Sequence, residues 1–296
     1  MEENKTNMMQ SGFASHGEGK INFDQITIKN DVMFSSVFRD PEDCRELLQR
    51  ILGMKISEIV ISDDQKSIKA KTWSKGIRLD IYAKDAEGNV YDIEMQVLNT
   101  KELALRSRYY HSEMDSYQIQ AGHKYTELKS SIVIFICGFD LFEQDRSIYT
   151  FKTLCEENPE LALNDKRTTI FVNLKGNREG LPPELVRLLD YLETSEATDE
   201  FTEQINDRVV NLRNDFEWRE NYMTMEMKME EQFEAGLEQG LAQGLEQGLA
   251  QGLEQGIKIL FYDVHMTIPE IAEKLSITEE QVREIVENLG KQQECH

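Results

Sequence analysis

Apolar and polar residues alternate along the stretch GIRLDIYAKDAEGNVYDIEMQV, residues 76–97, as they do in two paired β-strands. The turn falls at residues 85–89, where Gly88 suits the left-handed position that follows a type I turn in a three-residue hairpin loop. Side chains of a strand point alternately to its two faces. One face is therefore apolar and consists of Ile77, Leu79, Ile81, Ala83, Tyr91, Ile93, Met95 and Val97.

The other face of this hairpin is polar and brings like charges together. Counting back from the turn pairs Asp80 with Glu94 and Arg78 with Gln96, and opposed residues have β-carbons about 5 Å apart. Two carboxylates at this distance destabilise the pair unless a positive charge lies between them. Either a divalent cation bridges them, or they form an ordinary solvated face that Arg78 or Lys84 neutralises.

A divalent cation at this pair would suit phosphodiester chemistry. Mg²⁺ takes one or two carboxylates from a protein, keeps several waters and accepts phosphate oxygens as its remaining ligands. Such a cation activates water and stabilises the charge that develops in the transition state. Gln96 shares a face with Glu94 and is placed to orient the water or a phosphate, although a neutral amide cannot supply the positive charge of a lysine.

The patterning up to residue 174 predicts an α/β domain with a mixed central sheet. Residues 30–52 have the pattern of one or two short helices, with Asn30 or Asp31 as the first cap and Pro41 at the second start. The further elements are two strands, the hairpin, a helix and two more strands, at residues 56–65, 69–73, 76–97, 101–128, 131–139 and 167–174.

Helical periodicity dominates the second half, at residues 181–193 and 200–236, and leads into the repeat GLEQGLAQGLEQGLAQGLEQG at 236–256. A four-residue period drifts by about 40° per repeat around a helix. Each Gly makes helix formation less favourable by about 1 kcal/mol relative to Ala. The small residues beside each Leu would let another helix approach closely, so the repeat is either a self-association segment or a flexible spacer.

The tail at residues 268–289 has the pattern of a helix-turn-helix, with Ala272 at the close contact and residues 276–278 as the turn. Its second helix is acidic and contains Arg283 as its single base. A helix that reads DNA needs more cations. We therefore favour packing or oligomerisation over DNA reading for this tail.

Composition limits the partners and the compartment. The 296-residue chain has a net charge of −22, yet residues 21–129 hold 16 Lys and Arg against 18 Asp and Glu, whereas residues 130–296 hold 15 against 34. The first half can therefore still present cations to phosphate. The four cysteines lack CxxC spacing, which indicates reduced thiols. The absence of a signal-peptide pattern or a membrane-spanning run predicts a cytoplasmic protein.

The D-x13-E-x-Q pattern on two successive strands resembles the PD-(D/E)XK nuclease core with glutamine in the lysine position. More specifically, the chain resembles the Rpn family of recombination-promoting nucleases and transposases. The resemblance spans residues 24–140, with weaker similarity reaching residue 230. It is carried by the segments NDVMFSSVF at 30–38, LDIYAKDAEGNVYDIEMQ at 79–96, RSRYYHSEMDSYQIQAGHKY at 106–125 and SIVIFICGF at 131–139.

The resemblance implies a restriction-endonuclease-like fold and metal-dependent DNA endonuclease activity, linked to recombination, mobile elements or phage defence. It implies that Asp80 and Glu94 hold Mg²⁺, or alternatively Mn²⁺, with the Met95 carbonyl as a further ligand. Gln96 takes the place of the lysine, so the resemblance leaves open whether the site is slow, relies on the metal for positive charge, or is inactive.

The resemblance also assigns roles outside the hairpin. Asp31 matches an acidic family position and either completes the metal site or caps a helix. Arg106, Tyr109 and Tyr110 match an R-x-x-Y-Y helix of the family. Arg106 is then a phosphate contact, and the two tyrosines either bind substrate or pack in the core.

The family further implies self-association through residues 231–296 and, in some members, an internally translated C-terminal fragment, for which Met223, Met225, Met227 and Met229 offer starts. The chain then divides into a disordered segment 1–20, a nuclease-like domain with a helical extension 21–230, a repeat helix 231–257 and the tail 258–296. The rival interpretations are a non-enzymatic oligomeric scaffold and a DNA-binding recombination accessory, each with a degenerate nuclease domain.

Overall fold

The computed structural model describes residues 21–61, 80–119, 122 and 124–293, in two compact units that meet between Tyr222 and Met223. Three predictions lie outside the described residues: the disordered segment 1–20, the strand at 69–73, and the start of the hairpin with Arg78. The predicted α/β fold class with a mixed sheet is confirmed for the first unit.

The first unit is built on a six-stranded sheet, whose parallel centre has antiparallel strands at both edges. The central strands are almost entirely buried, as expected for parallel strands that are covered on both sides, and β4 is the most apolar of them. In spatial order the strands are β1 (Ile59–Ile61), β2 (Ile81–Asp85), β3 (Val90–Gln96), β4 (Ser131–Cys137), β6 (Arg167–Asn173) and β5 (Ile148–Phe151).

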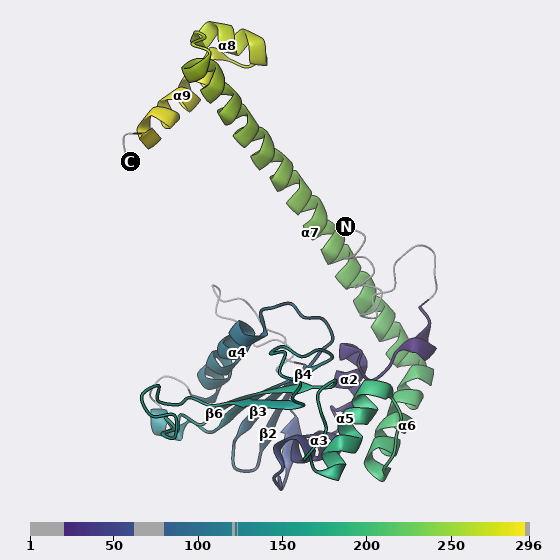
Figure 1. Ribbon diagram of the computed structural model, residues 1–296. Helices are drawn as coiled ribbons and strands as arrows, with labels where there is room; N and C mark the ends of the chain where they lie inside the picture. Colours follow the sequence, from purple (N-terminus) through teal and green to yellow (C-terminus); the bar gives the residue numbers. More distant parts are fainter. Residues whose placement is uncertain (1–20, 62–79, 120–121, 123, 294–296) are drawn as a thin grey trace. The chain divides into compact units, whose positions relative to one another are not determined.

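Helices cover both faces of this sheet (Figure 1). Helix α4 (Leu103–Gln118) packs Leu103, Tyr110 and Met114 on one face. The other face is covered by α2 (Asp31–Val37), α3 (Pro41–Leu52), α5 (Pro183–Thr194) and α6 (Glu200–Asn214), and two single turns, η1 (Phe23–Gln25) and η3 (Tyr125–Glu127), complete the unit.

The hairpin has the predicted register. Ile81 pairs with Ile93 and Ala83 with Tyr91, so the strand positions meet as counted from the turn. Gly88 has a φ of +89°, and its N–H donates to the Asp85 carbonyl at 3.0 Å. A left-handed residue at this point closes the loop without strain only when it is glycine.

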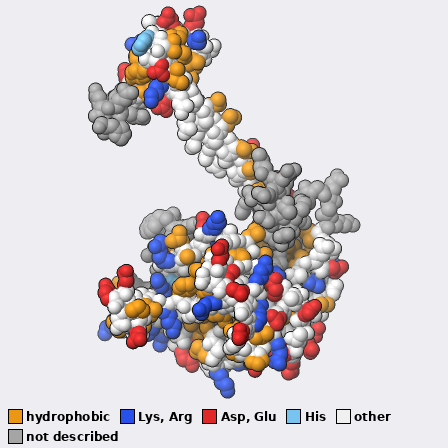
Figure 2. Space-filling model, in the orientation of Figure 1, with side chains coloured by type: hydrophobic (Ala, Val, Ile, Leu, Met, Phe, Trp, Pro, Cys, Tyr) orange, Lys and Arg blue, Asp and Glu red, His pale blue; other side chains and the backbone are white. Residues whose placement is uncertain are grey.

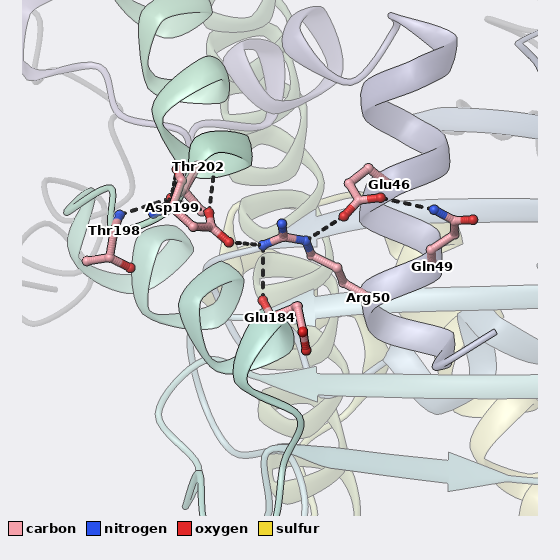
Figure 3. Close-up of polar contacts among 7 residues, drawn as sticks. All are labelled: Glu46, Gln49, Arg50, Glu184, Thr198, Asp199 and Thr202. Carbon is pink, nitrogen blue, oxygen red and sulfur yellow. Dashed lines mark hydrogen bonds and ion pairs between the residues drawn. The ribbon is translucent and has the colours of Figure 1, made fainter. Parts of the chain in front are cut away.

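A buried arginine joins the helices on the face opposite α4 (Figure 3). The side chain of Arg50 on α3 is 9% exposed and pairs with Glu46 at 2.9 Å and with Asp199 at 2.8 Å. It also donates to the Glu184 carbonyl on α5 at 3.1 Å and lies over the Phe201 ring. Because Asp199 caps α6, this one guanidinium ties three helices together.

The second unit consists of the greater part of α7 (Phe216–Lys258), the π-helical turn η4 (Ile259–Asp263), α8 (Ile268–Leu275) and α9 (Glu279–Gln293). The two helices predicted for the tail are present, and their turn has Ser276 at a φ of +55°. A small core of Ile257, Ile271, Ala272 and Val282 holds the tail to the end of α7.

Two helix boundaries and one strand differ from the sequence prediction. The helix predicted at 101–128 ends at Gln118, and the chain is extended at Ile119. The helix predicted at 200–236 breaks at Asp215, whose carboxylate accepts from the Trp218 N–H at 2.6 Å and thereby begins a new helix. Strand β5 was not predicted, because it is only four residues long and half-exposed.

Candidate metal and phosphate site

The two carboxylates predicted to face each other are brought together at one end of the hairpin. Asp80 directly precedes β2 and lies opposite Glu94 on β3 by continuation of the register. The Asp80 carboxylate accepts from the Met95 N–H at 3.4 Å, which places it against β3. Glu94 is 3% exposed. The pair therefore forms a site at the carboxyl end of β3.

The interpretation of this face as solvated is wrong for Glu94. Tyr82, Asp92 and Glu94 share the polar face of the hairpin, and all three are buried. They are buried because α4 packs over this face. Hydrophobic alternation predicted the two faces correctly but did not show that both are covered, since polar residues on a strand face usually indicate solvent.

Arg106 on α4 is the cation that meets Glu94. Its Nη2 lies 2.6 Å from Glu94 Oε2, and its Nη1 donates to Gln96 Oε1 at 2.8 Å. Its Nε and Nη2 donate to the Tyr110 hydroxyl at 3.2 and 2.8 Å, and the guanidinium lies over the Tyr110 and Phe135 rings. Charge-assisted hydrogen bonds of this kind hold a guanidinium in one orientation.

Asp92 is a third acid of the site, and the sequence analysis missed it. It is fully buried on β3, two residues before Glu94 and on the same face. Neither of its carboxyl oxygens has a hydrogen-bond partner among the described residues, and Glu94 Oε1 has none either. The period-two alternation that placed Glu94 and Gln96 on one face was the signal that could have identified it.

Burial dominates the electrostatics of these acids. Burial raises the pKa of Glu94 to about 7, against the opposing effect of the Arg106 charge, and Asp31 adds a smaller repulsion. The pKa of Asp92 is raised well above its usual range, first by burial and then by the negative charges of Glu94 and Asp80. An ionised carboxylate in this position requires positive charge nearby.

The donor set fits a hard divalent cation. Buried carboxyl oxygens without partners are costly unless a ligand satisfies them, and among the described residues Arg106 is the cation that acts on both Asp92 and Glu94. Carboxylate oxygens are the ligands that Mg²⁺ and Mn²⁺ prefer. In the part of the chain that the structure describes, no three His, Cys, Asp or Glu side chains already form a metal-binding cluster. The Met95 carbonyl stays a prediction.

The remaining predicted site residues differ in their placement. Asp31 is exposed at the first position of α2 and close enough to act on the Glu94 charge, while Asn30 is the N-cap that accepts from the Met33 N–H. Tyr110 is buried and its hydroxyl holds Arg106. Tyr109 is half-buried and packs against the cluster beneath α4.

Opposed carboxylates at the ends of neighbouring strands, beside a guanidinium from α4, are groups that suit metal-dependent phosphodiester chemistry. The family comparison agrees: the model of the PD-(D/E)XK nuclease family transposases matches residues 28–239, and the chain belongs to this family. The match confirms the resemblance drawn from the hairpin and its neighbouring segments. No curated protein and no solved structure matches the chain.

Proposed function

We propose that the protein is a metal-dependent DNA endonuclease that hydrolyses phosphodiester bonds. The observation that carries this proposal is the state of Glu94, a buried carboxylate with one oxygen held by Arg106 and the other without a partner among the described residues. Asp80 lies opposite it. The membership of a nuclease family supports the same reaction class.

In this mechanism the residues of the chain divide the work. Asp80 and Glu94 would hold Mg²⁺ or Mn²⁺, which when bound supplies Lewis acidity at the phosphate and lowers the pKa of water. Arg106 donates to a phosphate oxygen and stabilises the negative charge that grows there. Tyr110 fixes Arg106, and burial raises its pKa, so its hydroxyl stays protonated. Asp31, at the rim, adds negative charge.

DNA as the substrate also requires cations around the site. On the face shown in Figure 2, the Lys and Arg side chains of the first unit lie interspersed with Asp and Glu. Two further cations are exposed in this region: Lys101, two residues before α4, and Arg108 on α4. Such a mixed surface favours contact with a short stretch of phosphates over long non-specific binding, which scales with the number of neutralised phosphates.

Nicking of supercoiled plasmid tests this proposal. Wild-type protein is incubated with Mg²⁺, Mn²⁺ or EDTA beside Asp80→Asn and Glu94→Gln. A control, Asp85→Asn, alters a buried acid at the far end of the same hairpin, where it accepts from Asn89 and Tyr91. Metal-dependent nicking that both site variants lose and the control keeps is expected. A folded wild-type protein that fails to nick the plasmid with either Mg²⁺ or Mn²⁺ would refute the proposal.

We also propose that residues 231–296 self-associate. The repeat is helical, and Leu237, Leu241, Leu245 and Leu249 on it are 53–66% exposed. A Cβ added at any glycine from 236 to 256 would meet nothing within 4 Å in the chain. Rows of residues four apart pack into each other at a crossing angle of about −50°, and a second copy of the same helix supplies the matching row. Paired nuclease units would allow cleavage of both strands.

The second unit begins at Met223, the first of the four clustered methionines. Translation from this cluster would therefore produce essentially that unit alone. We propose such a fragment as a partner that competes for the repeat of the full chain. Immunoblotting with a C-terminal tag, compared with a version in which the four methionines are replaced by leucine, tests for the fragment. A blot that shows full-length protein alone argues against it.

One rival function is supported by the same exposed leucines. If the nuclease unit is degenerate, the repeat and tail are the active part of an oligomeric scaffold. A folded oligomer that binds no divalent cation would favour this scaffold. DNA binding that survives Asp80→Asn but is lost on deletion of residues 258–296 would favour the DNA-binding accessory.

A further inference from the structure

The amide of Gln96 is engaged at both ends. Its Nε2 donates to the Leu98 carbonyl at 2.9 Å, and its Oε1 accepts from Arg106 Nη1 at 2.8 Å. A carbonyl can only accept and a guanidinium can only donate, so the two partners determine the orientation of the amide. Each end of the amide thus has one fixed partner, and together they determine where the side chain lies.

Arg106 is held firmly but not enclosed. A guanidinium has five N–H groups, and four hydrogen bonds connect Arg106 to Gln96, Glu94 and Tyr110. Within the described ranges, one N–H on Nη1 is left without an acceptor, beside the bond to Gln96. The side chain is 29% exposed, in contrast to 4% for Glu94. The side chain is therefore partly accessible, and it retains one N–H without an acceptor among the described residues.

A lysine at position 96 would disrupt this arrangement. Its ammonium would lie next to the Arg106 guanidinium in place of the amide oxygen, and two like charges within about 4 Å repel strongly in a partly buried site. A neutral acceptor attracts the guanidinium instead. The glutamine is thus complementary to Arg106, and the two positions act as a pair from different elements, β3 and α4.

We propose that Gln96 is a positioning residue that aims Arg106, and that Arg106 delivers to the scissile phosphate the positive charge that a lysine at position 96 would otherwise deliver. This inference rests on the proposed nuclease function. It explains how the site can be active with glutamine at position 96, since Arg106 on α4 supplies the positive charge.

Plasmid nicking with Mg²⁺ by Gln96→Lys, Arg106→Gln and the double variant tests the pairing. Loss of one preorganised donor to a developing oxyanion lowers kcat by about 100-fold, which is expected for Arg106→Gln with little change in KM. Gln96→Lys should lower kcat at least about 10-fold because it displaces Arg106. The double variant should recover at least about 10-fold over Arg106→Gln, since its lysine replaces the lost charge without repulsion.

Two further variants keep the test decisive. Gln96→Met keeps the length of the side chain but removes the acceptor, and it should lower kcat while Mn²⁺ affinity stays unchanged. Leu105→Lys adds a cation on the exposed side of α4, where Leu105 is 62% exposed, and it should not lower kcat. Circular dichroism and thermal melting establish that each variant is folded.

The outcomes distinguish this inference from the proposed function. A double variant less active than both single variants, or Gln96→Lys more active than wild type, would overturn the pairing while nuclease activity stands. Wild-type protein that nicks no DNA with any metal would overturn the proposed function, and the inference with it. Recovery of activity in the double variant supports both.

Discussion

Acidification should destabilise the first unit through His111, which lies on α4 directly after Tyr110. The imidazole is 1% exposed, with Nδ1 2.8 Å from Ser131 Oγ on β4 and Nε2 3.0 Å from Thr169 Oγ1 on β6. It therefore ties the helix that carries Arg106 to two strands of the sheet. The pKa of His111 is lowered to about 4, mainly by burial and then by the charge of Arg167, against the opposing effect of Asp165.

The sign and size of the effect follow from this lowered pKa. The folded state prefers the neutral imidazole, so the stability that His111 contributes is complete above its unfolded pKa of about 6.5. It is lost as the pH falls from about 6.5 towards 4, because the unfolded chain takes up the proton first. Proton linkage between these two values gives a loss of about 2 kcal/mol between pH 7.5 and pH 5, and a limiting slope of about 1.4 kcal/mol per pH unit.

Urea unfolding in the presence of EDTA measures this loss at pH 7.5, 6 and 5. Wild type is compared with His111→Gln, which cannot titrate in this range, and with His265→Gln, which replaces an exposed histidine of the second unit. Carboxylates that titrate in this range contribute equally to all three proteins, so the difference between slopes belongs to the histidine. If His111→Gln loses as much stability as wild type between pH 7.5 and pH 5, the reasoning is refuted.

Three other predictions concern the metal site and the repeat. Asp80→Asn and Glu94→Gln should each weaken Mn²⁺ binding at least about 10-fold in calorimetric titration, because each removes a charged ligand; unchanged affinity in either variant would exclude that residue as a ligand. Asp92→Asn should weaken Mn²⁺ binding in the same assay while the protein stays folded, since its buried oxygens lack partners among the described residues, and an affinity equal to wild type would make Asp92 purely structural. The double variant Gly244→Ala, Gly248→Ala should make helix formation more favourable by about 1 kcal/mol per site and yet shift the oligomer towards monomer in sedimentation velocity. If helix formation and association both become more favourable, the glycines lie outside the interface.

The hairpin could be predicted closely from the sequence because its determinants are local. The glycine at position 88 determines where the loop closes, and a slip of one residue would move every apolar side chain to the wrong face. The opposed positions of Asp80 and Glu94 follow from that register alone. Strands β4 and β6 were also predicted, β4 from its long apolar run and β6 from its β-branched and aromatic residues.

The partners of the acids could not be predicted, because they depend on how α4 docks. The ion pair between Glu94 and Arg106 joins residues 12 apart in the sequence and on different elements. Nothing in the hairpin pattern distinguishes a face covered by a helix from a face in water, so Asp92 and Tyr82 had the same pattern as exposed residues. The sequence suggested Arg78 or Lys84 as neutralising cations, because only neighbours on the hairpin can be judged from strand periodicity.

The repeat has a low intrinsic helix stability, which links its helix formation to the proposed self-association. The six glycines from position 236 to 256 make helix formation less favourable by about 6 kcal/mol than alanines at the same positions would. The leucines between them contribute little in a single chain, since they are mostly exposed. Burial of those leucines against a second copy would supply the missing free energy at about 25 cal/mol per Å² of apolar surface. Helix formation in the repeat is then coupled to association, so a change that weakens the interface also weakens the helix that presents it.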